Sequence, residues 1–121
     1  MTNKKEEFLR KFNDAFLKPD IPFILDSVTD DVEWEMVGDQ TFHGKEELQK
    51  FFDNMDDSSK LLSTTIDAII THGRKASVNG RMTMENKGAE EHYGFCDVYE
   101  FSGFKDPKIK KLTSYIVILK S

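Results

Sequence analysis

Residues 29–48 constrain the fold of this chain more than any other segment. Residues 29–38 are typical of an acidic turn followed by a strand over 31–37, because large apolar residues alternate with charged ones. Val32, Trp34 and Met36 fall on one face of that strand, which we expect to face the interior. Gly44 marks a loop shortly afterwards, and a helix is predicted to start beyond it. A strand closed by a helix in this way builds one wall of a pocket.

Three helices are predicted in the first half of the chain. Apolar residues recur at helical spacing over residues 3–17, where they form one aromatic stripe. This helix ends before Lys18, because Pro19 disfavours helical geometry in the residue that precedes it. Asp20 is predicted to cap a second, short helix. A third helix is expected over residues 45–55.

After Ser58 and Ser59 the apolar pattern changes from helical spacing to alternation, which predicts strands. Gly73 and Gly88 mark two of the turns as hairpins, because glycine adopts positive φ at little cost. Helices first and hairpin-linked strands afterwards imply an α+β fold, with a curved antiparallel sheet and the helices on one of its faces. The four strands are expected at 63–71, 75–85, 90–102 and 109–120, with the last turn at 103–107.

The composition fits one globular domain that spans residues 1–121. A chain of this length buries roughly two thirds of the surface that its unfolded form exposes. The 38% hydrophobic content, which includes ten Phe, can supply one core. The net charge of −5 argues against a nucleic-acid partner, since phosphate binding relies on clustered Lys and Arg. No apolar run reaches the roughly 20 residues that a membrane span needs.

The single cysteine, Cys96, argues against an internal disulfide and a cysteine-based zinc site. Residues 1–7 are charged and lack the apolar core of a secretion signal. Three scattered histidines without an i,i+4 pair give little support to a metal site. We therefore expect a cytoplasmic protein that uses no metal and no organic cofactor.

The outward phase of the last strand predicts a dimer. Thr113, Tyr115, Val117 and Leu119 form a surface that is apolar for an exposed sheet face. An uncovered patch of that kind usually marks an interface. A two-fold homodimer through the outer face of the sheet is the simplest arrangement.

Asp97 is the strongest candidate for chemistry. Strand alternation places it on the same face as Phe95 and Tyr99, on an otherwise aromatic surface. Burial among aromatic rings raises the pKa of a carboxyl group and suits it to proton transfer near neutral pH. Tyr99, or Tyr93 nearer the strand start, could direct a hydroxyl to a bound carbonyl. A structural alternative stays open, in which Asp97 only bonds a neighbouring tyrosine hydroxyl or a backbone amide.

The order of these elements resembles the SnoaL-like branch of the nuclear transport factor 2-like superfamily. The residues that carry the resemblance lie at 30–34, 42–46 and 95–101, and it covers essentially the whole chain. It implies a cone of strongly bent, antiparallel or mixed sheet wrapped around the N-terminal helices. The cone would hold an internal pocket and dimerise through its outer sheet face. Relatives include polyketide cyclases, ketosteroid isomerase and limonene epoxide hydrolase.

The resemblance also implies which known mechanisms this chain lacks. The isomerase pattern needs a base and a tyrosine, but the corresponding positions fall at Met36 and near Phe12. The epoxide hydrolase pattern needs an arginine and a second acid, but the corresponding positions fall near Phe95 and near Ser114. Neither mechanism is supported by these residues. A cyclase-like mechanism that relies on one carboxylate, Asp97, stays open.

The predicted function is binding of a small hydrophobic or carbonyl-bearing molecule. If turnover occurs, it would be an isomerisation, cyclisation or dehydration that uses one acid/base carboxylate. The alternative is a non-catalytic ligand-binding or dimeric interaction module whose pocket is filled by its own side chains. Catalysis is assigned to Asp97 and Tyr99. The residues expected to contact the ligand are Phe12, Phe16, Trp34, Met36, Met82, Tyr93, Phe95 and Ser114.

Overall fold

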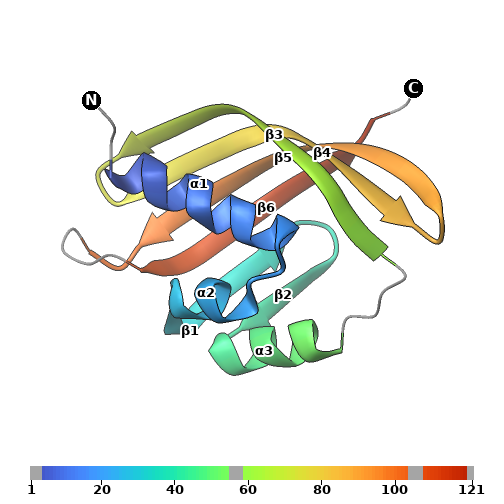
Figure 1. Ribbon diagram of the computed structural model, residues 1–121. Coiled ribbons are helices and arrows are strands. Elements are labelled where there is room, and N and C mark those ends of the chain that lie inside the picture. The colour runs from blue at the N-terminus through green and yellow to red at the C-terminus, as the bar shows by residue number, and fades with distance from the viewer. Residues whose placement is uncertain (1–3, 55–58, 104–107, 120–121) are drawn as a thin grey trace.

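The helices of the protein lie on the concave side of one curved sheet (Figure 1). The computed structural model describes residues 4–54, 59–103 and 108–119. The helices are α1 (Lys4–Leu17), α2 (Ile21–Asp26) and α3 (Lys45–Asp53). The strands are β1 (Val28–Met36), β2 (Gln40–His43), β3 (Ser59–His72), β4 (Lys75–Asn86), β5 (Ala89–Phe101) and β6 (Ile109–Ile118).

The strands form one mixed sheet in the order β2-β1-β6-β5-β4-β3. β1 runs parallel to β6, and the other neighbouring strands are antiparallel. The sheet is strongly bent and does not close into a barrel, with β2 and β3 at its two edges. The predicted α+β class, with helices on one face of a bent sheet, is confirmed.

The helices form where the sequence predicts them. The aromatic stripe of α1 turns inward and buries Leu9 and Phe12 in the core. Asp20 caps α2, because its Oδ1 accepts a hydrogen bond from the backbone N–H of Phe23 at 3.3 Å. α3 follows Gly44, whose φ of +87° is a conformation that favours glycine. The expected end of this helix at residue 55 lies outside the described residues.

The structure corrects the predicted organisation around β1. β1 begins at Val28, three residues before the expected strand. Residues 40–43, predicted as part of a loop, form the edge strand β2 and pair antiparallel with β1. Four residues are too few for alternation to reveal a strand, so the pairing becomes visible only in three dimensions. Part of the turn predicted at 103–107 lies outside the described residues.

The bend that wraps the sheet around α1 has a local cause in β3 and β4. The register of this pair shifts between Ile66 and Ala68, as at a β-bulge, which bends a strand and increases its twist. Gly80 faces this point, and a Cβ at that position would lie only 1.9 Å from the carbonyl oxygen of Thr65. The absence of a side chain at Gly80 therefore lets β3 approach and curl over α1 (Figure 1).

Candidate functional site

Two hydrogen-bonded arms converge on the carboxyl group of Asp97 in β5. The hydroxyls of Ser114 in β6 and Tyr99 in β5 both bond this carboxyl group. Ser114 Oγ in turn accepts a hydrogen bond from Trp34 Nε1 at 3.1 Å. On the other arm, Asn13 Nδ2 donates to Tyr99 Oη at 3.2 Å. Each hydroxyl accepts from one neighbour and donates its hydrogen to Asp97, so the donors and acceptors of both arms match.

Burial is the dominant influence on Asp97. Loss of hydration raises the pKa of this carboxyl from 3.8 to about 6, against the two hydroxyl hydrogen bonds, which lower it. Burial also raises the pKa of the Tyr99 phenol, and the nearby Asp97 charge adds to the effect. The phenol therefore acts as a hydrogen-bond donor, while Asp97 can exchange a proton near neutral pH.

Strand register places Asp97 in a row that crosses the concave face. Met36 lies beside Ser114, Ser114 beside Asp97, and Asp97 beside Val78. Paired residues share a face of the sheet, so Asp97 is the ionisable member of an otherwise apolar or hydroxyl-bearing row. Asp97 and Met36 are only partly buried, whereas Val78 is fully buried.

Aromatic rings from α1 cover this network. Phe12 contacts Tyr99 edge-on, with ring centroids 6.0 Å apart, and approaches Trp34 at 6.4 Å. Phe16 meets the indole of Trp34 at 5.8 Å. Phe12 and Trp34 are buried, while Phe16 is half-buried. The residues predicted from the sequence as cavity lining therefore include both packed core and partly accessible surface.

Met82 and Tyr93, also predicted as ligand contacts, lie further along the sheet. They pair with each other across β4 and β5 and stand two rows from Asp97. The Tyr93 hydroxyl bonds the Glu91 carboxylate, and burial together with that negative charge raises the pKa of the phenol. Phe95 occupies the row between them and is largely buried. The structure thus brings Trp34, Ser114, Asp97 and Tyr99 into one hydrogen-bonded group and leaves Met82 and Tyr93 outside it.

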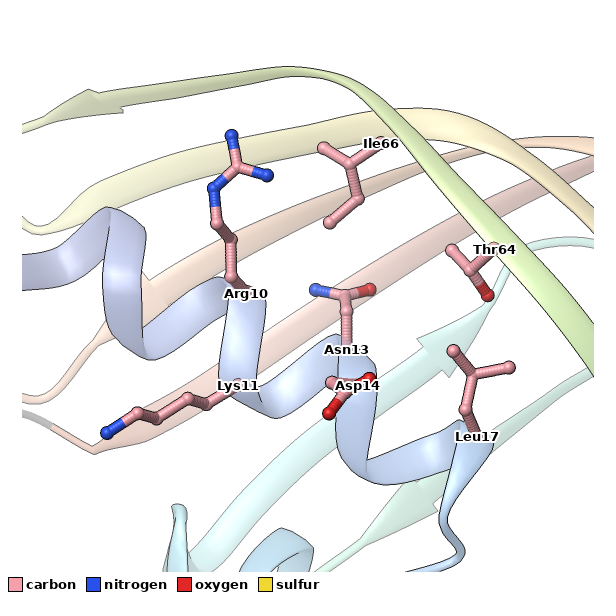
Figure 2. A pocket seen from close by; sticks show the side chains of 7 residues that line it. All are labelled: Arg10, Lys11, Asn13, Asp14, Leu17, Thr64 and Ile66. Atoms are coloured by element: carbon pink, nitrogen blue, oxygen red, sulfur yellow. The ribbon is translucent and has the colours of Figure 1, made fainter.

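A pocket of about 350 Å³ lies between α1 and β3 (Figure 2). This volume falls within the range of small-molecule sites. The pocket lies on the concave side because Ile66 shares a face of the sheet with Phe95. Ile66 pairs with Gly80, and Gly80 pairs with Phe95. The described residues that line it are Arg10, Lys11, Asn13, Asp14, Leu17, Thr64 and Ile66.

Sequence reasoning missed these lining residues, and Asn13 is the most informative of them. It belongs both to the pocket wall and to the hydrogen-bond network that reaches Asp97 through Tyr99. Asp97 does not itself line the pocket but stands two hydrogen bonds behind it. The available signal was an amide between Phe12 and Phe16, close to the buried stripe of a helix.

The charged group around Glu33 lies away from this network. Glu33 in β1 approaches His43 at 3.8 Å and Lys111 at 3.6 Å, on strand phases opposite to Trp34 and Leu112. Within residues 4–54, 59–103 and 108–119, no group of three His, Cys, Asp or Glu side chains could hold a metal ion. No helix in the described part of the chain is long and apolar enough to cross a membrane.

Comparison with known sequences identifies one matching family. The family model described as a SnoaL-like domain matches residues 9–112, which is most of the chain. Curated proteins provide no significant match.

Solved structures share the fold along nearly the whole chain. A nuclear transport factor 2-like protein of unknown function from Cytophaga hutchinsonii is 25% identical, with a TM-score of 0.68 over 93% of this chain and 98% of that one. An LEH-like epoxide hydrolase from M. tuberculosis is 16% identical, with a TM-score of 0.78 over 92% of this chain and 80% of that one. A ketosteroid isomerase-like protein from Erwinia carotovora atroseptica is 19% identical, with a TM-score of 0.71 over 96% of this chain and 98% of that one.

Proposed function

This chain belongs to the SnoaL-like domain family, and on that premise we propose that it binds a small, mainly hydrophobic carbonyl compound on the concave side of its sheet. We further propose that Asp97 transfers a proton to or from this compound. The observation that carries the proposal is the position of Asp97, a carboxyl with a pKa of about 6 on a face otherwise made of apolar and hydroxyl-bearing side chains.

The chemistry proposed for Asp97 follows from its protonation. At neutral pH the group is mostly a carboxylate, yet its raised pKa makes it a stronger base than an ordinary aspartate. As a base it would take a proton from the carbon next to the ligand's carbonyl and leave an enolate. Return of that proton at another position would complete an isomerisation. The protonated group could equally serve as the acid in a cyclisation or dehydration.

The hydroxyls around Asp97 fit a positioning role. The sequence predicts that Tyr99 directs its hydroxyl to a bound carbonyl. In the structure Tyr99 is 1% exposed, and its hydroxyl is hydrogen-bonded to Asn13 and Asp97. Ser114 is likewise buried between Trp34 and Asp97. We therefore assign both residues the task of holding the carboxyl group in place, and reserve contact with the ligand for Asp97.

The side chains around Asp97 are suited to contact with an apolar ligand. Half-buried side chains pack against the core on this side, among them Phe16, Met36, Ile66 and Met82. The pocket beside α1 adds about 350 Å³ within two hydrogen bonds of the carboxyl. Adaptable methionines and aromatic rings suit ligands that are held mainly by shape and apolar contact.

A second candidate function is a non-catalytic binding module. The same two hydroxyl bonds that would position Asp97 for catalysis would also fix it as part of the core. The ring contacts of Phe12 with Tyr99 and Trp34 favour this alternative, because they pack the core against residues of the network that holds Asp97.

Deuterium exchange separates the two functions. Small cyclic ketones and enones would be incubated with the protein in D2O, and loss of their α-protons followed by NMR. We expect the wild-type protein to accelerate exchange and Asp97→Asn to abolish it without loss of folding. Asp67→Asn, an equal charge change at an exposed site, serves as the control and should exchange normally.

Two results would decide against the enzymatic form of the proposal. Undiminished exchange with Asp97→Asn would remove Asp97 from the mechanism. Saturable ligand binding without any exchange would favour the non-catalytic module.

A further inference from the structure

The orientation of the Asn13 side chain in the pocket wall is set by its neighbours. Asn13 Nδ2 lies 2.8 Å from the carbonyl oxygen of Leu9 and 3.2 Å from Tyr99 Oη. A backbone carbonyl can only accept, so the side-chain atom beside it must be the NH2 group rather than the oxygen. Both hydrogens of that NH2 group are thereby used.

The remaining Asn13 atom is an acceptor that the pocket can use. Figure 2 shows its oxygen on the side of the amide that faces Thr64. Since the NH2 group is held from behind by Leu9 and Tyr99, the amide is not free to turn over and offer a donor instead. The wall therefore presents a fixed acceptor, which selects ligands that carry a hydroxyl or N–H group.

Cations dominate the charged part of the same pocket. Arg10 and Lys11 line it, against the single carboxylate of Asp14, and the Lys11 ammonium is directed away from Leu17, Thr64 and Ile66 (Figure 2). Asp14 is offset by Lys18, whose Nζ lies 2.7 Å from its Oδ2. Arg10 bonds Glu6 at 3.2 Å, but its side chain is 55% exposed and its guanidinium has further N–H groups. The pocket thus favours a negatively charged ligand.

The rest of the lining is apolar or weakly polar. Leu17 comes from the last turn of α1, and Ile66 and Thr64 come from the facing side of β3 (Figure 2). All three are partly buried and can cover the hydrocarbon part of a ligand. From the fixed acceptor, the cations and this apolar wall we infer that the ligand is a small apolar carboxylate that also carries a hydroxyl. This inference rests on the proposed function, and it adds a carboxylate and a hydroxyl to the carbonyl-bearing ligand proposed there.

Three related probes test the inference in the unmodified protein. They are 4-hydroxycyclohexanecarboxylate, cyclohexanecarboxylate and the neutral methyl ester of the latter. Binding would be followed by chemical-shift changes of the backbone amides of Leu17, Thr64 and Ile66. At low salt we expect the carboxylate to bind about fivefold more tightly than the ester, and the hydroxyl to add about another fivefold. The advantage of the carboxylate should shrink as salt screens the exposed cations.

Substitutions on α1 separate the cations from general effects on the helix. The double variant Arg10→Gln with Lys11→Gln should lose the preference for the carboxylate over the ester. Glu6→Gln breaks the same Arg10–Glu6 ion pair but leaves the guanidinium in place, so it should keep the preference. Lys4→Gln removes a cation from an exposed site on α1 and should also keep it.

The outcomes distinguish this inference from the proposed function. Equal binding of ester and carboxylate at these amides overturns the anionic class and leaves the proposed function standing. Equal binding with and without the hydroxyl overturns the role of Asn13. If none of the probes perturbs these amides, the inference fails as a whole, while α-proton exchange by other ketones would still support the proposed function.

Discussion

The amide of Asn13 on α1 holds the hydroxyl of Tyr99 on β5, at a distance of 3.2 Å and a separation of 86 positions in the chain. This bond links the wall of the pocket to the carboxyl group of Asp97, since the Tyr99 hydroxyl donates a hydrogen bond to that carboxyl. A change in the protonation of Asp97 therefore reaches the pocket through two side chains. The bond between Asn13 and Tyr99 therefore joins the helical layer to the hydrogen-bond network of the sheet.

The stability of the protein should depend on pH through Asp97. Its pKa rises from 3.8 to about 6 on folding, so the folded state binds a proton more tightly than the unfolded state. The resulting stabilisation is complete below pH 4 and is lost as pH rises through 6. The full difference amounts to about 3 kcal/mol. The side chain in Asp97→Asn does not titrate, so this variant does not lose that stabilisation. The free energy of unfolding of Asp97→Asn minus that of the wild type should therefore increase by up to about 3 kcal/mol from pH 4 to pH 7.

Urea unfolding at several pH values measures this difference. The exposed Asp67→Asn variant carries the same change in charge and should follow the wild-type pH dependence. If plots of the free energy of unfolding against pH ran parallel for wild type and Asp97→Asn, the Asp97 carboxyl would keep its hydration in the folded state, and this prediction would be wrong.

Removal of the Ser114 hydroxyl should raise the pKa of Asp97 further. That hydroxyl stabilises the charged carboxylate and also accepts the hydrogen of Trp34 Nε1. Ser114→Ala therefore leaves the Trp34 Nε1 donor unpaired and removes one of the two hydroxyl hydrogen bonds to Asp97. We expect a loss of about 1–3 kcal/mol in the free energy of unfolding. Carbon-13 NMR titration of the Asp97 carboxyl should give a midpoint above 6.

The neighbouring Thr113 offers a matched control, because it follows the opposite phase of β6 and pairs with Val98. Thr113→Ala should leave the titration of Asp97 in place. An unshifted Asp97 midpoint in Ser114→Ala would separate this serine from the network.

We expect the protein to dimerise through the outer face of its sheet. Val98, Tyr115 and Val117 lie on that face, and these residues are 38%, 47% and 63% exposed. An apolar patch of this kind is costly in contact with water and favours association. Val117→Lys should convert a dimer into a monomer, which sedimentation velocity would detect.

The adjacent Ile118 provides a stringent comparison. It is 65% exposed, nearly the same as Val117, but follows the opposite strand phase. Ile118→Lys should therefore leave the dimer intact. A monomeric wild-type protein, or dissociation by Ile118→Lys alone, would contradict an interface on the outer face.

The sequence predicted the parts of the fold and site that depend on local spacing. Alternation in residues 90–102 placed Asp97 and Tyr99 on one face, and the helical stripe of residues 3–17 turned Phe12 inward, as the structure shows. Both signals require only that neighbours along one element share a face. Residues 40–43 gave no comparable signal, because the short strand that they form depends on pairing with β1.

The pocket could not be predicted because it depends on relations between distant elements. Asn13 reaches Tyr99 only after α1 packs against the sheet, and alternation within a strand says nothing of that contact. The wall formed by Thr64 and Ile66 depends on the register shift in β3, where the strand curls over the helix. From its strand face alone, the sequence predicts that Tyr99 donates a hydrogen bond to the ligand. In the structure its hydroxyl is hydrogen-bonded to Asn13 and Asp97 instead.

The curl of β3 depends on the absence of a side chain at Gly80. A Cβ at this position would lie 1.9 Å from the carbonyl oxygen of Thr65, a backbone atom that cannot move without shifting the strand. Gly80→Ala should therefore lower the free energy of unfolding by about 3 kcal/mol, at the upper end of overpacking effects. Gly94→Ala places the same methyl group in a strand 3.7 Å from the flexible side chain of Leu119 and should be nearly neutral. Thermal and urea unfolding of the two variants would compare them directly. If Gly80→Ala folds as stably as Gly94→Ala, β3 does not lie against β4 at this point, and the wall that Ile66 and Thr64 contribute to the pocket would have to be placed elsewhere.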